Sequence, residues 1–377
     1  MKTRLPAGLF GLPVHELRCG YYSDIYFWRE KRTLEEHGVR SEVTMQVFQK
    51  KDAVLCGADE ALAVLRAASG RFTDPTRAAA LFERYRPAGA GRGSIESELN
   101  ALWVDGFSQL EVRALYDGDR VAPWESVLHI TGEASLFAHL ETVYLGILAR
   151  RTKIASNVRQ VVEAAGGKPV LYFPARFDHW AVQAGDGYAA FIGGADGVST
   201  PAQTAWTAAS PLGTVPHALI AAVGGHTVRA VTLFGESFPA VHIVALVDFD
   251  NDCVGTSLAC CEALGERLWA VRLDTAAAVV DPSSSGPGVT AELVERTRQQ
   301  LDAHGFGHVK IMVSGGFNPK RIRAFESEAV PIDAYGVGSW MLQGDCDFTA
   351  DVVLLDGRPC AKVGRAYAPN PRLARVD

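Results

Sequence analysis

The chain has 377 residues, of which 48% are hydrophobic and 21% charged, so it is not an intrinsically disordered protein and is long enough for two domains. Its formal net charge of −6, without any long basic run, argues against a general nucleic-acid-binding protein. An anionic substrate must therefore be attracted by local groups.

The chain carries no clear targeting signal. No apolar run approaches the roughly 18 residues that a membrane-spanning helix needs, and Pro6 and Pro13 interrupt the apolar pieces of the N-terminal segment. The seven cysteines are scattered and form no CxxC pair, which predicts reduced thiols rather than disulfides or a zinc site. We therefore expect a cytoplasmic protein.

The first part of the chain predicts a mixed α and β domain after an irregular arm over residues 1–19. Apolar helical spacing predicts helices over 59–68 and 136–165. Alternating or β-rich stretches, some with Asp-Gly turns beside them, predict strands over 21–27, 41–48, 99–104, 110–115 and 126–131.

From residue 170 onward the pattern changes to short apolar runs separated by helical or loop segments such as 291–305. The runs cover residues 170–176, 188–199, 242–252, 268–275, 309–317 and 333–340. Strands that are continuously apolar are buried on both faces, as in a parallel sheet covered by helices. The sequence therefore predicts β/α units.

Polar residues follow these runs at their carboxyl ends. They are Arg176, Asp178, His179, Asp196, Ser199, Asp248, Asp250, Asn251, Asp252, Arg272, Asp274, Ser314, Asn318 and Ser339. In a β/α barrel the carboxyl ends of the strands share one rim, where the chemistry takes place. We therefore predict one common site.

Two glycine-rich stretches on successive strands predict a phosphate site on that rim. They are Ser314-Gly315-Gly316 and Gly336-Val337-Gly338-Ser339. Glycines leave backbone amides uncovered for an anion, and in barrels phosphate often binds between the loops of the last two strands.

The last part of the chain, 348–364, resembles a β-hairpin with an Asp356-Gly357 turn, and we expect it to rejoin the sheet of the first domain. The predicted domains are an N-terminal α+β domain (1–125), a β/α barrel with the phosphate site (126–343) and a C-terminal tail (344–377). The Ser/Gly/Pro-rich loop 277–289 is either a mobile lid or a surface linker.

The order of motifs resembles the nicotinate phosphoribosyltransferase family, one of the type II phosphoribosyltransferases. The resemblance is collinear from about Gly20 to Gly364. It lies in GYYSDIYF, LETVYLGILARRTKIA, FPARFDH, FIGGADGVS, GTVPHAL, LVDFDND, VRLDT, VSGGF and GVGS.

This resemblance implies an incomplete or distorted TIM-like β/α barrel with an α+β sandwich domain built from the N-terminal part and the C-terminal tail. It also implies transfer of a phosphoribosyl group from 5-phosphoribosyl 1-pyrophosphate to nicotinate in NAD salvage. Mg²⁺ is then the expected cofactor and ATP a co-substrate, and a homodimer or higher homo-oligomer shares its active sites.

The resemblance also implies roles for individual residues. Tyr26, from a neighbouring subunit, and Phe173 would stack on the pyridine ring, Arg176 would pair with a carboxylate or phosphate, and Asp196 would lie beside the ring. Asp248, Arg272 and Asp274 would act on the ribose, the pyrophosphate and Mg²⁺. His217 would carry phosphate. The 5-phosphate would lie against Ser314, Gly315, Gly316, Gly336, Gly338 and Ser339.

Alternatives stay open at this point. Tyr26 and Phe173 could be core aromatics, His217 could be structural, and the acidic run 248–252 could be a solvated strand end. The family usually has a second arginine where this chain has Phe177, so another aromatic base is an alternative substrate. A non-catalytic phosphoribosyl-binding paralogue is the second alternative. An aldolase-type barrel is disfavoured, because Lys310 lies early in its strand.

Overall fold

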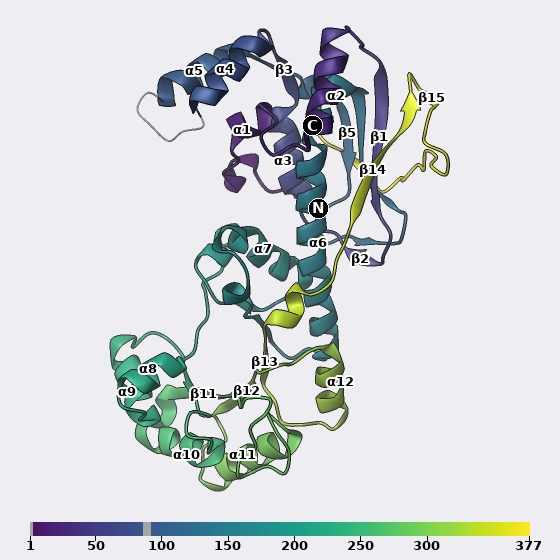
Figure 1. The fold of residues 1–377 in the computed structure, drawn as a ribbon. Helices are drawn as coiled ribbons and strands as arrows, with labels where there is room; N and C mark the ends of the chain where they lie inside the picture. Colours follow the sequence, from purple (N-terminus) through teal and green to yellow (C-terminus); the bar gives the residue numbers. More distant parts are fainter. Residues whose placement is uncertain (1–2, 86–91) are drawn as a thin grey trace. The chain divides into compact units, whose positions relative to one another are not determined.

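The computed structural model describes residues 3–85 and 92–377, and the chain forms two compact units (Figure 1). The first unit combines Met1–Lys153 with Gly344–Asp377, and the second is Ile154–Gln343. No helix within the two described ranges has the length and apolar character required to cross a membrane.

The first unit is built on an antiparallel six-stranded sheet. In spatial order its strands are β15 (Arg358–Pro359), β14 (Phe348–Leu355), β1 (Glu42–Gln49), β7 (Ser126–Glu133), β5 (Glu111–Ala114) and β16 (Ala374–Arg375). The C-terminal tail rejoins this sheet, because β14 pairs along β1 from Val43 to Gln49. Residues 126–153, which we expected in the barrel, lie in the first unit, where β7 pairs with both β1 and β5.

The described residues of the first unit also form two small antiparallel pairs, several short 3-10 helices and five whole α-helices. The pairs are β2 (Ala53–Val54) with β6 (Arg120–Val121) and β3 (Gly70–Phe72) with β4 (Trp103–Asp105). The helices are α1 (Val14–Arg18), α2 (Ile25–Glu36), α3 (Ala58–Ala68), α4 (Pro75–Tyr85) and α5 (Arg92–Leu102), and α6 (Glu141–Ala164) starts here.

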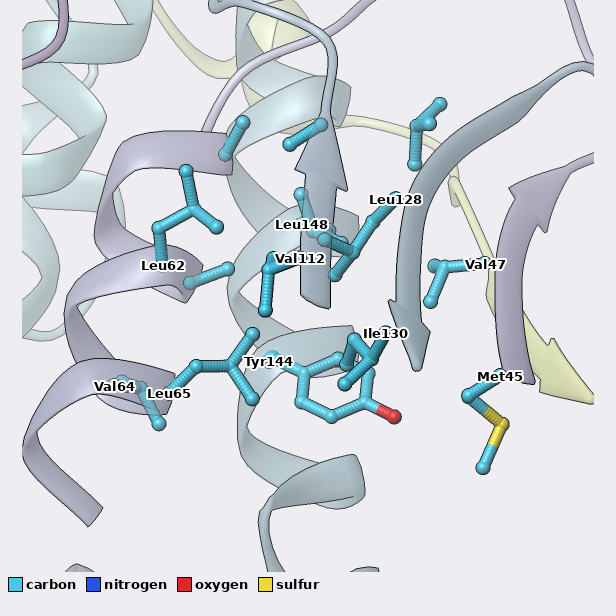
Figure 2. Packing of buried hydrophobic residues seen from close by; sticks show 14 of the residues in the cluster. Met45, Val47, Leu62, Val64, Leu65, Val112, Leu128, Ile130, Tyr144 and Leu148 are labelled. Atoms are coloured by element: carbon cyan, nitrogen blue, oxygen red, sulfur yellow. The ribbon is translucent and has the colours of Figure 1, made fainter. Parts of the chain in front are cut away.

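The core of the first unit lies between helices α3 and α6 and one face of the sheet (Figure 2). Leu65 of α3, Tyr144 of α6 and Ile130 of β7 are fully buried in it. The 3.6-residue spacing of apolar positions in α3 and α6 and the alternation in the strands aim these side chains at one another.

Three predicted strands are wrong in type. Residues 21–27 lead into helix α2 instead of forming a strand, and residues 99–104 end helix α5 and begin β4. The first half of 188–199 belongs to helix α7 (Gln183–Gly193), and only Gly197 and Val198 form a strand. The glycines of α7 make the segment resemble a loop-flanked strand, but they allow close packing: a Cβ on Gly187 would meet the backbone of Gln203 at 2.0 Å.

The second unit contains a parallel six-stranded sheet. In spatial order its strands are β10 (Ile243–Leu246), β11 (Leu268–Leu273), β12 (Lys310–Val313), β13 (Ala334–Val337), β8 (Val170–Tyr172) and β9 (Gly197–Val198). Since β13 pairs with β8, the strand order is circular except that β9 and β10 do not pair. The expected parallel sheet is confirmed.

Helices connect these strands. Besides α7 they are α8 (His217–Ala222), α9 (Thr227–Ser237), α10 (Cys253–Leu264), α11 (Ala291–Ala303) and α12 (Pro319–Ser327), with the end of α6. The gap between β9 and β10 is filled by the segment Leu212–Val215: the Leu212 amide donates to Val198 O (2.8 Å), and the Val215 amide to Val244 O (3.1 Å).

One face of the parallel sheet carries a layer of apolar side chains, one each from five strands: Leu171, Val244, Ala270, Met312 and Ala334. Alternate residues of a strand point to the same face, so the residues two positions further on form the next layer toward the carboxyl ends. That layer is Phe173, Leu246, Arg272, Ser314 and Gly336.

Candidate active site

A cavity of about 850 Å³ opens at the carboxyl ends of the parallel strands. All five residues of the layer above the apolar cluster line it, so the strand period itself builds its floor. The residues after β9, Ser199 and Thr200, add to the wall. The sheet edge that we expected to be polar is therefore a cavity of ligand size.

Most of the predicted site residues line this cavity. They are Phe173, Arg176, His217, Arg272, Asp274, Ser314, Gly315, Gly316, Gly336, Gly338 and Ser339. Asp248 does not line it but contacts a residue that does, namely His217. Asp196 and Tyr26 do not line the cavity either.

Arg272 is held at the floor by a closed set of polar contacts. Its Nε donates to Ser314 Oγ at 2.8 Å, and its Nη2 lies 3.2 Å from Asp274 Oδ2. The Ser314 hydroxyl in turn donates to Asp274 Oδ1 at 2.5 Å. Ser314 is only 3% exposed, so its side chain orients the Arg272–Asp274 pair and is not free for a phosphate.

His217 and Asp248 form a second polar pair. His217 begins helix α8, and its Nε2 lies 3.0 and 3.1 Å from the two carboxylate oxygens of Asp248. Burial raises the pKa of Asp248 above its ordinary value, while the contact with His217 pulls it back. The other acids of the run differ: Asp250 is exposed, and Asp252 caps α10 by accepting from the Gly255 amide at 2.9 Å.

The Gly315-Gly316 turn has the form of an anion-binding loop. Both glycines have positive φ (82° and 74°), a conformation that favours glycine. Within residues 3–85 and 92–377, neither of their amides has a hydrogen-bond partner. Arg321 braces the turn, since its Nη1 donates to Gly315 O at 2.8 Å. Burial lowers the pKa of Arg321 below its ordinary value.

Gly336 in β13 and Gly338 just after it are glycines for a different structural reason. A Cβ on Gly336 would lie 2.8 Å from the Phe173 ring, and one on Gly338 would lie 2.9 Å from the Phe177 ring. Gly336 and Gly338 thus let two aromatic rings lie against the strand. The Arg272 guanidinium lies 5.5 Å from the centre of the Phe173 ring, and that of Arg176 lies 5.3 Å from the Phe177 ring.

Asp196 is not at the carboxyl edge. Its carboxylate accepts from the amide of Val170, the first residue of β8, at 2.8 Å, and it precedes β9. Because parallel strands run in one direction, this places Asp196 at the amino edge, opposite the cavity. The expectation went wrong with the strand boundary, since β9 begins only at Gly197.

Tyr26 belongs to the first unit, in helix α2, and is 59% exposed. It is therefore not a core aromatic. Its neighbours Tyr21, Tyr22 and Ile25 are also 48–57% exposed, which makes this stretch an apolar surface of the first unit.

Sequence reasoning missed Thr214, Thr200 and Gln343 on the cavity wall. Thr214 accepts from Arg272 Nη1 at 3.0 Å. No periodic signal marks it, because it lies in the non-strand segment between β9 and β10. Lys310, at the start of β12, pairs with Asp333 at 3.3 Å, away from the carboxyl ends.

The loop after β11 is anchored rather than loose. Asp281 is fully buried and accepts from the Cys253 amide at 2.9 Å, and Gly288 N donates to Val279 O at 2.8 Å. All seven cysteines are free, as expected. The described residues contain no cluster of three or more His, Cys, Asp or Glu side chains suited to a metal ion.

The chain is 30% identical over 277 residues to nicotinate phosphoribosyltransferase pncB1 of Mycobacterium tuberculosis, an alignment covering 71% of this chain and 57% of that protein. It is 31% identical to a crystal structure of nicotinate-nucleotide pyrophosphorylase from Pyrococcus furiosus, covering 94% of this chain and 80% of that one, with a TM-score of 0.75. The chain belongs to the nicotinate phosphoribosyltransferase family.

Other comparisons bear on the fold. Human nicotinic acid phosphoribosyltransferase has a TM-score of 0.69 at 17% identity, covering 92% of this chain and 77% of that chain, and shares the fold. No protein-family model matches the chain. This member of the nicotinate phosphoribosyltransferase family spans 57% of the length of the curated relative from Mycobacterium tuberculosis.

Proposed function

We propose that the protein transfers a phosphoribosyl group from 5-phosphoribosyl 1-pyrophosphate to nicotinate or a related pyridine, releasing pyrophosphate, in NAD biosynthesis. The observation that carries the proposal is the Arg272–Ser314–Asp274 set beside the open Gly315-Gly316 turn in one cavity. A cation and free amides next to a carboxylate suit a reaction in which pyrophosphate leaves a ribosyl centre that becomes positive.

The charge of each residue indicates which part of the substrate it would contact. Arg272 would bind the pyrophosphate, and the Gly315 and Gly316 amides the 5-phosphate. Asp274, which lines the cavity, would face the positive ribosyl centre, and Asp248, behind His217, would add its negative charge from outside the lining. The same two carboxylates would hold Mg²⁺, which usually takes one or two carboxylates together with substrate phosphates, and which would neutralise pyrophosphate charge when bound.

We further propose that ATP drives the reaction through His217. The contact with Asp248 uses Nε2, so Nδ1 is the nitrogen that would accept a phosphoryl group. A carboxylate on the opposite ring nitrogen also stabilises the positive imidazole that forms. The His217→Ala variant should keep a slow, ATP-independent transfer and lose ATP hydrolysis.

Labelling with γ-³²P-ATP tests this step. The wild type should carry an acid-labile label and His217→Ala none, while His226→Ala, an exchange outside the cavity, should label normally. An unlabelled wild type, or a labelled His217→Ala protein, would contradict the ATP coupling but not the transfer itself.

The base is set by the aromatic part of the cavity. Phe173 and Phe177 would receive a planar ring, and Arg176 is the cation beside them. An assay of pyrophosphate release with a panel of pyridine acids and amides identifies the base. Release with no pyridine but with another aromatic base would replace nicotinate by that base. Binding of the donor without release would favour a non-catalytic paralogue.

The circular strand order supports an incomplete TIM-like barrel, closed by the segment 212–215 instead of a β9–β10 pair. We also propose a cytoplasmic homo-oligomer in which Tyr26 serves the active site of a neighbouring subunit. Its exposure in α2 supports that role. Inactive Tyr26→Ala and Arg272→Ala proteins, refolded together, should then regain part of the activity, and no gain over the separate proteins would argue against shared sites.

A further inference from the structure

Thr214 lies where two parts of the cavity meet. Its segment fills the gap between β9 and β10 and is fastened there by the amides of Leu212 and Val215. Between these two anchors, the Thr214 hydroxyl accepts from Arg272 Nη1 at 3.0 Å. His217, three residues later, begins α8 and pairs with Asp248.

Few side chains of this segment are buried and could fix its orientation. Val215 is fully buried, but Leu212, Gly213, Pro216 and His217 are exposed. Among the described residues, the hydrogen bond from Arg272 to Thr214 is the side-chain hydrogen bond that joins residues 212–215 to the cavity floor.

The same bond limits how Arg272 can turn. A guanidinium has five N–H donors in one plane. Ser314 takes the donor on Nε and Thr214 one on Nη1, while Nη2 forms an ion pair with Asp274 Oδ2 at 3.2 Å. Each terminal nitrogen therefore keeps at least one donor that no hydrogen bond uses, and two such donors side by side can bind two oxygens of one phosphate.

We infer that Thr214 is a positioning residue that orients Arg272 for pyrophosphate and thereby links the pyrophosphate end of the cavity to the segment carrying His217. This inference rests on the proposed function. Without the Thr214 hydroxyl, Nη1 has no acceptor on that side, and the guanidinium can rotate away from the two-oxygen geometry. The hydrogen bond to Ser314 and the ion pair with Asp274 would remain.

Titration of each protein with inorganic pyrophosphate tests the inference, with ³¹P NMR to reach weak binding. Thr214→Val keeps the side-chain volume and removes the acceptor, so pyrophosphate affinity should fall about tenfold. Thr214→Ser keeps the hydroxyl and should bind within about twofold of the wild type. Thr207→Val is the matched control, because the Thr207 hydroxyl bonds to Thr204 O in the same connection and should not affect binding.

The Arg272→Ala variant distinguishes a role of Thr214 in orienting Arg272 from a role in general stability. If Thr214 acts through Arg272, adding Thr214→Val to Arg272→Ala should change pyrophosphate affinity by less than about twofold, because residues in one network are not additive. In steady-state assays Thr214→Val should raise the donor KM and leave the KM for the base unchanged.

The outcomes are distinct. Equal affinity of Thr214→Val and the wild type overturns the inference and leaves the proposed function intact, and so does a full tenfold loss from Thr214→Val in the Arg272→Ala background. A wild type that binds neither pyrophosphate nor the phosphoribosyl donor overturns the proposed function itself. A tenfold loss rescued by serine and absent without Arg272 supports the inference.

Discussion

The two units of this protein differ in whether their polar side chains are joined to one another by hydrogen bonds. In the first unit, the hydroxyl of Tyr144 in α6 (Figure 2) and Nε2 of His129 in β7 are buried and have no hydrogen-bond partner among the described residues. At the edge of the parallel sheet, Arg272, Ser314, Asp274 and Thr214 are joined by hydrogen bonds and line one cavity.

Strand direction explains the difference. Parallel strands bring all their carboxyl ends to one edge, so polar residues just beyond each strand meet there. Antiparallel strands alternate, which separates the corresponding residues onto two edges. The first unit therefore supplies a core and surfaces, while the second gathers side chains for chemistry.

Carboxylates show the same contrast. Burial, followed by repulsion from Glu30, Asp351 and Asp24, raises the pKa of Glu141 in the first unit to about 8. Asp248 in the second unit is also raised by burial, but His217 opposes the shift. A cationic or hydrogen-bonding neighbour is what keeps a buried carboxylate ionised and usable.

The largest effect is expected when the positive charge of Arg272 is removed from the carboxyl edge of the parallel sheet. Arg272→Ala should lower kcat/KM for the donor by roughly 10³-fold or more, because it removes the cation that would meet the leaving pyrophosphate. Arg267→Ala is the matched control: Arg267 precedes the same strand, and its Nη2 donates to Gly235 O at 2.7 Å. Similar losses in both variants would mean that Arg272 only stabilises the unit.

The next largest effect is a loss of stability in the core of the first unit, which packs on the antiparallel sheet. Leu65→Ala empties a fully buried position in the first core and should lower the free energy of unfolding by about 2–5 kcal/mol. Pyrophosphate affinity of the folded protein should stay within about twofold. Chemical denaturation and pyrophosphate titration measure the two quantities, with the exposed Val104→Ala as control. A large change in affinity would break the separation of roles.

A smaller effect concerns the glycines under the aromatic rings. Gly336→Ala should reduce kcat/KM about tenfold, because its Cβ meets Phe173, a ring less exposed than Phe177. Gly338→Ala should cost less, since the 51% exposed Phe177 can move. Steady-state kinetics with both substrates decide the order, and a larger loss at Gly338 would contradict it.

The smallest effect is a pH dependence in the first unit. The folded-state pKa of Glu141 lies above its unfolded value, so the folded state binds the extra proton and stability falls as pH rises from about 4.5 to about 8. Glu141→Gln should raise the melting temperature by a few degrees at pH 8.5 and change it little at pH 4.5. Thermal melts at both pH values check this, and an equal shift at both would exclude ionisation as the cause.

Much of the second unit could be predicted from the sequence, because its strands are continuously apolar and end in polar residues. Residues 268–275 and 309–317 predicted β11 and β12 and the cavity residues after them. The predictions failed where the local composition is atypical of the element formed. The glycines in α7 favoured a strand over a helix, and the tyrosines of 21–27 favoured a strand where the chain leads into α2.

The sequence by itself determined the elements and the residue types at the strand ends, since burial and the two-residue period act locally. Only the tertiary structure decided which of those residues meet. Asp196 lies at the amino edge, because β9 starts only at Gly197, and the Ser314 hydroxyl donates to Asp274. The tertiary structure also brought Thr214 to Arg272, 58 positions away, because the segment 212–215 takes the place of a missing strand pair.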